Sequence, residues 1–194
     1  MVKGGLMVAM GDSFTWTSVN QGSNLYVTKT WRAICDQYGE IRHINKGIGN
    51  TTSAAMVTNL QWLYNFDADL VTIGVGMNDA KNNQVSVSDY KVNLRIIIDF
   101  IKAKKADTHV VLCTPARTSD ANRSTLPDYR TAMAEVATEK GVSLCRFEDA
   151  YSDEEIPTHT NDDLLHPNIA GHQRLFETLY PVIRQGFWLS RLQE

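Results

Sequence analysis

Short apolar runs alternate with longer segments of helical periodicity along the chain. The short runs are continuously apolar, which is typical of strands buried on both faces of a parallel sheet. The longer segments repeat apolar residues every three to four positions, as amphipathic helices do. We therefore expect strands over residues 6–10, 41–45, 70–75, 109–114 and 142–147, and helices over residues 27–38, 52–66, 86–105, 126–140 and 168–185.

This alternation of strands and helices predicts an α/β fold of the three-layer α/β/α type. We expect a flavodoxin-like sheet of about five parallel strands with helices on both faces, forming a single domain over residues 1–194. Ligands of such sheets bind at the carboxyl ends of the strands. The longest irregular stretches, residues 15–26, 116–125 and 149–163, are expected at that edge.

Composition narrows the classes of function. The formal net charge is −3, and Lys and Arg are scattered, so we expect no nucleic-acid partner. No apolar window approaches the roughly 18 residues of a membrane span, and the short N-terminal apolar run reads as a strand rather than a signal peptide, which favours a cytoplasmic protein. The three cysteines form no CxxC pair, which argues against a disulfide framework or a zinc site. Cys113 and Cys145 are expected in the core.

Four short motifs stand at the predicted ends of strands or before the last helix. Residues 11–14 (Gly-Asp-Ser-Phe) follow the first strand, and residues 45–51 (Asn-Lys-Gly-Ile-Gly-Asn-Thr) follow the second. Residues 76–79 (Gly-Met-Asn-Asp) follow the third strand, and residues 163–166 (Asp-Leu-Leu-His) precede the last helix. Each motif alone is short enough to occur by chance, but their order along one predicted sheet indicates a single site.

With these motifs the chain resembles the SGNH hydrolase superfamily, the GDSL-like esterases and lipases, from Gly11 to His166. The resemblance implies that Ser13 is the nucleophile and that Asp163 and His166 complete a catalytic triad. It also implies oxyanion donors from the Ser13 N–H, a glycine after the second strand and Asn78. The second motif is one residue shorter than the family's usual Gly-x-x-Gly-Asp/Asn-Thr. Gly49 is therefore the favoured second donor, and Asn50 is the alternative.

Elementary chemistry agrees with these roles. A serine hydroxyl is a weak nucleophile until a neighbouring base takes its proton, and an imidazole suits that task near neutral pH. A carboxylate on the other ring nitrogen fixes the tautomer. Asp163 and His166 are three positions apart, so one turn can bring them together. Asp12 is expected to accept backbone hydrogen bonds instead, and His172 should point elsewhere.

We expect a serine esterase that acts through an acyl-serine intermediate, with no cofactor and no metal. The loops around the expected site are polar and offer no apolar lid, which favours a short acyl group, such as O-acetyl on a carbohydrate or another polar carrier. Trp16, Asn50 and Arg117 are expected to bind the carrier, although Trp16 could equally serve only in packing. The alternatives are a lysophospholipase or thioesterase-type lipid acylhydrolase and, in other classes, a non-catalytic binding module or a flavodoxin-like nucleotide binder. Against the last, the chain lacks the third glycine of the dinucleotide fingerprint and a phosphate-binding loop with GK[ST]. The sequence does not indicate the oligomeric state.

Overall fold

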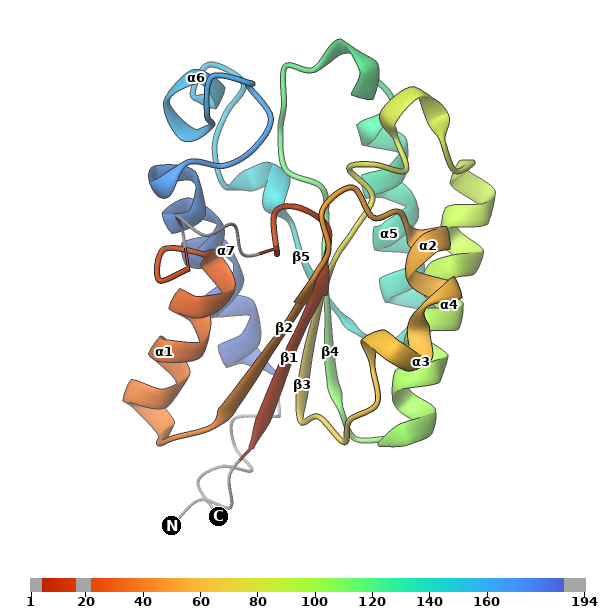
Figure 1. Ribbon diagram of the computed structural model, residues 1–194, viewed down its shortest axis with the longest axis vertical. Coiled ribbons are helices and arrows are strands. Elements are labelled where there is room, and N and C mark those ends of the chain that lie inside the picture. Colours follow the sequence, from red (N-terminus) through yellow and green to blue (C-terminus); the bar gives the residue numbers. More distant parts are fainter. Residues whose placement is uncertain (1–4, 17–21, 187–194) are drawn as a thin grey trace.

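Five parallel strands form one sheet in the computed structural model, which describes residues 5–16 and 22–186 (Figure 1). The strand order is β2-β1-β3-β4-β5, which is the flavodoxin-like order, so the predicted fold class is confirmed. From β1 the chain first adds β2 on one side and then adds β3 on the other side, so the strand order reverses between β1 and β3. The loops that leave β1 and β3 therefore border one crevice. The strands are β1 (Leu6–Gly11), β2 (Arg42–Gly47), β3 (Leu70–Gly74), β4 (His109–Cys113) and β5 (Ser143–Cys145).

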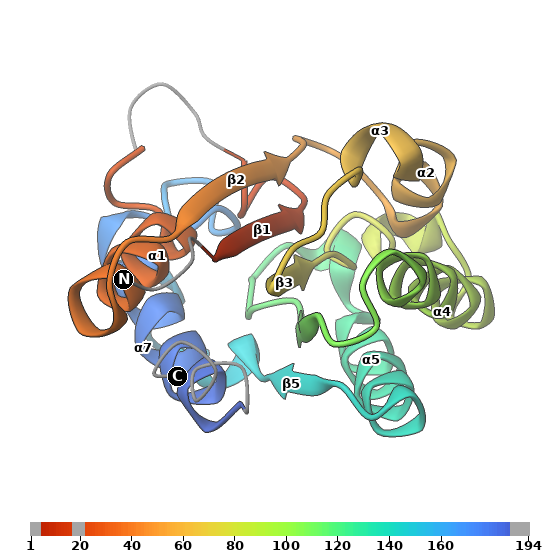
Figure 2. The ribbon, with the colours of Figure 1, turned by 90° about the horizontal axis from the view of Figure 1, so that it is seen from below.

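Helices cover both faces of the sheet (Figure 2). On one face, α1 (Tyr26–Tyr38) packs against α7 (Ile169–Gln185). The other face carries α2 (Ser53–Thr58), α3 (Leu60–Leu63), α4 (Val87–Lys104) and α5 (Leu126–Lys140), with α4 in contact with both α2 and α5. The short helix α6 (Ile156–His159) contacts α7. Within residues 5–16 and 22–186, no helix is long and apolar enough to cross a bilayer.

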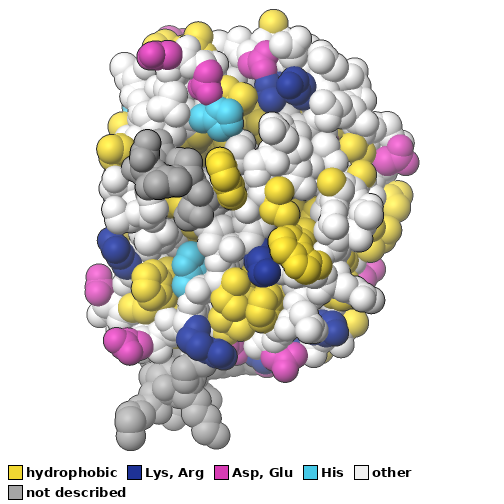
Figure 3. All heavy atoms as spheres, in the orientation of Figure 1, with side chains coloured by type: hydrophobic (Ala, Val, Ile, Leu, Met, Phe, Trp, Pro, Cys, Tyr) yellow, Lys and Arg dark blue, Asp and Glu magenta, His cyan; other side chains and the backbone are white. Residues whose placement is uncertain are grey.

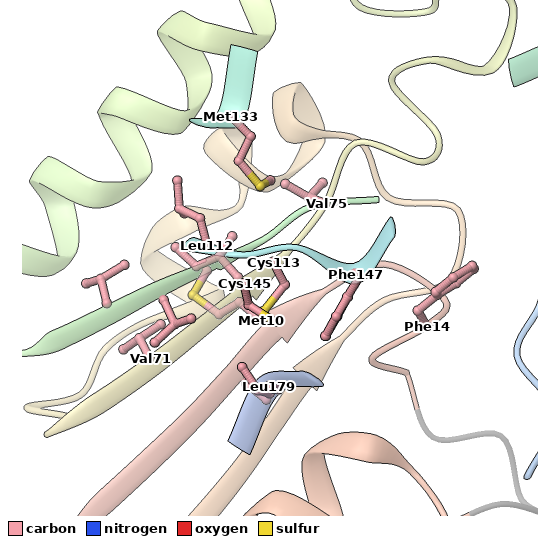
Figure 4. Packing of buried hydrophobic residues seen from close by; sticks show 14 of the residues in the cluster. Met10, Phe14, Val71, Val75, Leu112, Cys113, Met133, Cys145, Phe147 and Leu179 are labelled. Carbon is pink, nitrogen blue, oxygen red and sulfur yellow. The ribbon is translucent and has the colours of Figure 1, made fainter. Parts of the chain in front are cut away.

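The core lies between the sheet and its helices. Every residue of β1 is buried, as expected for a central strand with helices on both sides. Figure 4 shows Met10, Val71 and Leu112 of the strands, with side chains of α5 and α7 packed from opposite sides. Cys113 and Cys145 are buried free cysteines in this core, as predicted.

The helix predicted over residues 52–66 is wrong in its extent. It is divided into α2 and α3 at Asn59, whose backbone leaves helical geometry at φ −102° and ψ 12°. The Asn59 side chain donates a hydrogen bond of 2.9 Å to the Ala55 carbonyl, and asparagine often competes with the helical backbone in this way. Two stretches expected to be irregular also contain short helices: a 3-10 turn at Ala121–Arg123, and α6.

Candidate active site

Ser13 stands in a tight turn directly after the central strand β1. The turn is closed by the Asp12 carbonyl, which accepts the N–H groups of Thr15 at 3.1 Å and Trp16 at 3.0 Å. The buried Asp12 carboxylate accepts the Phe14 N–H at 3.0 Å, which is the backbone-binding role predicted for it. Desolvation raises the pKa of Asp12 to about 7, although the Phe14 N–H opposes the rise.

The end of β2 holds this turn in place. The Asn45 side chain donates to the Thr15 carbonyl at 2.7 Å and accepts the Gly47 N–H at 2.8 Å. A Cβ on Gly47 would lie 2.3 Å from the Trp16 backbone nitrogen, so only glycine allows the two segments to approach this closely. Sequence reasoning placed Asn45 in a motif but missed this clamp. Its position beside glycines at a strand end was the available signal.

His166 joins Ser13 to Asp163. Its Nε2 lies 3.0 Å from Ser13 Oγ, and its Nδ1 lies 2.5 Å from Asp163 Oδ2. Asp163 Oδ1 also accepts the N–H groups of Leu165 at 3.0 Å and His166 at 2.9 Å. Leu164, between them, adopts a left-handed φ of 53° that closes the turn. The chain thus brings together three side chains that the sequence singled out.

Hydrogen bonding keeps Asp163 ionised. Partial burial raises the pKa of this carboxyl, but the hydrogen bonds from the His166 side chain and from the N–H groups of His166 and Leu165 outweigh it, so the pKa lies below its usual value. A carboxylate in this state orients the imidazole, because it accepts a hydrogen bond from Nδ1–H and leaves Nε2 to face Ser13.

The first three motifs supply several N–H donors. Among the described residues, the N–H groups of Ser13, Gly49 and Asn50 donate to no protein acceptor. The buried Asn78 amide donates one hydrogen bond of 3.0 Å to the Thr51 carbonyl, which links the third motif to the second and leaves its other N–H available. Gly49 and Asn50 both remain candidates for the second donor.

The first position of the third motif, Gly76, requires a glycine. Its φ of 127° is a conformation that side chains rarely adopt, and a Cβ there would lie 2.7 Å from the Tyr90 hydroxyl and 2.9 Å from Pro115. The buried Arg123, which sequence reasoning missed, donates from Nε to the Met77 carbonyl at 2.9 Å. Together these contacts fix the backbone that presents Asn78.

The predicted carrier-binding residues occupy two places. The Trp16 side chain is 48% exposed and packs over Gly49, with ring carbon Cε3 3.8 Å from where a Cβ would stand. The adjacent Asn50 is exposed, with a left-handed φ of 59°. Arg117 binds the Glu148 carbonyl at 2.7 Å and Asp153 at 3.0 Å. Their role toward a substrate stays a prediction.

The other titratable groups lie outside this arrangement. His172 is buried and stacks on Tyr26 at 6.2 Å, so it points elsewhere as expected, and burial lowers its pKa to about 4. In the part of the chain that the structure describes, no group of three or more His, Cys, Asp and Glu side chains is placed to hold a metal ion.

Comparison with known proteins decides the family. The sequence profile of the GDSL-like lipase/acylhydrolase family matches residues 9–174, which span all four motifs. The chain belongs to this family. The resemblance noted from the motifs is therefore confirmed, and this GDSL-like acylhydrolase is a carboxylic ester hydrolase. A search of curated protein sequences finds no match.

Solved structures share the fold of this GDSL-like acylhydrolase. Axe2, an acetylxylan esterase from Geobacillus stearothermophilus, is 23% identical with a TM-score of 0.76, over 97% of this chain and 98% of that one. TesA is 20% identical with a TM-score of 0.80, over 93% and 98%. LAE5, an α/β hydrolase enzyme from the metagenome of Lake Arreo, Spain, is 22% identical with a TM-score of 0.75, over 100% and 99%. At these identities the likeness concerns the fold alone.

Proposed function

We propose that this hydrolase removes a short acyl group, such as O-acetyl, from a carbohydrate or another polar carrier through an acyl-serine on Ser13. The observation that carries the proposal is the chain of contacts from Ser13 Oγ to His166 Nε2 at 3.0 Å and from His166 Nδ1 to Asp163 at 2.5 Å. A nucleophile, a base and a group that orients the base are the parts that acyl transfer requires.

The reaction uses these residues in turn. His166 Nε2 accepts the Ser13 proton as Oγ attacks the ester carbonyl carbon, and the carbonyl oxygen becomes an oxyanion. The N–H groups of Ser13 and of Gly49 or Asn50, with the Asn78 amide, stabilise that oxyanion. The carbon–oxygen bond to the carrier then breaks, and the departing alcohol takes the proton from His166.

Hydrolysis of the acyl-serine restores the enzyme. A water molecule gives a proton to His166 Nε2 and attacks the acyl carbon, again through an oxyanion held by the same donors. The carboxylic acid is released as Ser13 Oγ regains its proton from His166. Asp163 stays ionised throughout and stabilises the imidazolium that forms in each half of the reaction.

The surroundings of Ser13 favour a small acyl group. The loops over residues 116–125 and 149–163, which follow the sheet at its carboxyl end, are rich in polar side chains and offer no apolar lid for an alkyl chain. The exposed Trp16 offers an aromatic face to a carrier on the outer side. A lysophospholipase or thioesterase-type lipid acylhydrolase remains the second candidate, because the same catalytic parts serve those esters too.

The test is loss of activity and of covalent labelling on removal of the nucleophile. Wild type should hydrolyse p-nitrophenyl acetate and take up one fluorophosphonate per chain, whereas Ser13→Ala should do neither. Ser88→Ala, an exposed serine on α4, is the matched control and should behave as wild type. Hydrolysis retained by a folded Ser13→Ala protein would refute the proposal.

A further inference from the structure

A polar cavity of about 350 Å³ lies between the loop after β4 and the beginning of α5. Its lining includes the guanidinium groups of Arg117, Arg123 and Arg130 and the carboxylates of Asp120 and Asp153, so these groups bring one net positive charge. The volume is at the small end of ligand-binding pockets, large enough for one sugar-sized group.

The wall of this arginine cavity is also the support of the turn that carries Asp163 and His166. The Leu164 carbonyl accepts the Thr118 hydroxyl at 2.8 Å and the Ser119 N–H at 3.3 Å. Both donors belong to the cavity lining. A molecule that fills the cavity therefore lies next to the candidate catalytic turn, on the side of the β4 loop.

Two of the three arginines have donors to spare. Arg130 donates from Nε to the Pro115 carbonyl at 2.8 Å and from Nη2 to the Ala116 carbonyl at 2.7 Å, and it has no carboxylate within 4.0 Å among the described residues. Arg117 uses Nε and Nη1 and leaves Nη2 without a protein acceptor in that part of the chain. Its partner Asp153 is 71% exposed, so water screens that ion pair.

Charges of both signs act on Arg130. Burial lowers the pKa of the Arg130 guanidinium, the Glu148 carboxylate opposes this effect, and the positive charge of Arg117 adds to it. Arg123 is different, since it is paired with Asp120 and bound to the Met77 carbonyl. An anion in the cavity that Arg117 and Arg130 both line would accept their unused N–H groups.

We propose that the arginine cavity binds a carboxylate or phosphate on the carrier, so that the preferred substrate is the ester of an acidic sugar or a similar acidic polar molecule. This inference rests on the proposed function and specifies its substrate class. A planar guanidinium fork recognises both anions through paired N–H···O bonds. On the face in Figure 3, basic and acidic side chains gather near a histidine at the end where the strand-following loops lie.

The test compares three acetylated sugars that differ only at C6: methyl glucoside, methyl glucuronoside and methyl glucoside 6-phosphate. Wild type should show a kcat/KM about tenfold or more higher for one of the acidic esters than for the neutral ester. Arg117→Gln and Arg130→Gln should each reduce that ratio about tenfold. Arg95→Gln is the charge-matched control and should keep the ratio, because Arg95 is partly exposed and pairs with Glu139 near the end of α5, whereas the cavity lies at the beginning of that helix.

Direct binding separates this inference from the proposed function. Calorimetric titration with unacetylated methyl glucuronoside and methyl glucoside 6-phosphate should show binding that is lost in Arg117→Gln, a variant whose fold is checked by circular dichroism. Equal kcat/KM on all three esters, with hydrolysis that depends on Ser13, would overturn the inference and leave the proposed function intact. Binding that depends on Arg117, without hydrolysis of any ester, would overturn the proposed function and keep the anion site. The absence of Arg117-dependent binding would overturn the inference in either case.

Discussion

The carboxylate of Asp79 accepts three hydrogen bonds from Ser53. The Ser53 N–H lies 2.9 Å from Oδ1 and 3.1 Å from Oδ2, and the Ser53 hydroxyl lies 2.5 Å from Oδ1. Asp79 is fully buried, and Ser53 Oγ also accepts the Asn93 amide at 2.9 Å. Since Ser53 follows the second motif and Asp79 ends the third, this contact sets the spacing between Asn78 and the candidate donors Gly49 and Asn50.

Replacement of Asp79 by alanine should therefore affect both stability and chemistry. Buried donors of Ser53 lose their acceptor, which should lower the free energy of unfolding by about 1–3 kcal/mol in urea titrations. The value of kcat should fall more than KM rises, because misplaced oxyanion donors act in the transition state. Asp99→Ala, an exposed partner of Lys140, is the control and should change neither. An unchanged kcat in Asp79→Ala would separate the contact from catalysis.

Ser13, Asp163 and His166 should act as one unit. Single alanine substitutions should each reduce kcat by roughly 10³- to 10⁶-fold, and the double variant His166→Ala with Asp163→Ala should lose little more than His166→Ala alone. The measurement is kcat for all variants on one activated acetyl ester. Losses that multiply in the double variant would show that the two residues work separately.

Asn78→Ala should reduce kcat by about 10²- to 10³-fold with a similar KM, because the hydrogen bond to the oxyanion forms mainly in the transition state. Asn122→Ala, an exposed asparagine on the loop after β4, supplies the control. If the substitution at position 78 changed only KM, Asn78 would position the substrate instead.

Asp12 should make stability fall as pH rises. The raised pKa of about 7 means that the folded protein binds a proton more tightly than the unfolded chain, whose value is near 3.8. The cost of ionising Asp12 is absent below pH 3.8, grows between 3.8 and 7 and is complete above 7. Asp12→Asn keeps an acceptor for Phe14 N–H and should remove about 1–4 kcal/mol of this decline. The measurement is the free energy of unfolding in urea at pH 5 and pH 8 for wild type and Asp12→Asn. An equal decline between these pH values in the two proteins would contradict the prediction.

Activity should decline with acyl chain length. The loops over residues 116–125 and 149–163 are polar, and each buried methylene adds about 0.8 kcal/mol only where an apolar wall receives it. We expect kcat/KM for p-nitrophenyl esters to be highest from acetyl to butyryl and to drop at about eight carbons. A maximum at decanoyl or beyond would move the assignment to lipid or thioester hydrolysis.

The sequence predicted the fold because β1, β3 and β4 are almost wholly buried and read as apolar runs. The edge strand β2 is mostly polar and carries no buried residue, so its place followed from the alternation of strands and helices. The prediction failed where a single side chain decides the backbone, as at Asn59, whose local hydrogen bond ends α2 within an apolar periodicity that continues. β5 is also shorter than expected, since only Ser143–Cys145 pair with β4.

The candidate site was predictable in part, because short motifs follow strands whose carboxyl ends meet at one edge of the sheet. Ser13, Asp163 and His166 carried motif signals, and the structure brings them into contact. Of the arginine cavity, the sequence singled out only Arg117. Arg123 and Arg130 carried no signal, because they lie in a 3-10 turn and a helix whose approach depends on tertiary packing. The same holds for the contact of Asp79 with Ser53, which are 26 positions apart.

Ser13 and His166 are separated by 153 positions, and this distance has a consequence for biosynthesis. The ribosome delivers Ser13 well before His166, so a growing chain carries this serine without its imidazole partner until the segment before α7 emerges. If His166 is the base, as we propose, a nascent chain should cleave esters only after that segment has reached Ser13. The onset of turnover in a cell-free translation reaction marks the moment when both ends of the fold have met.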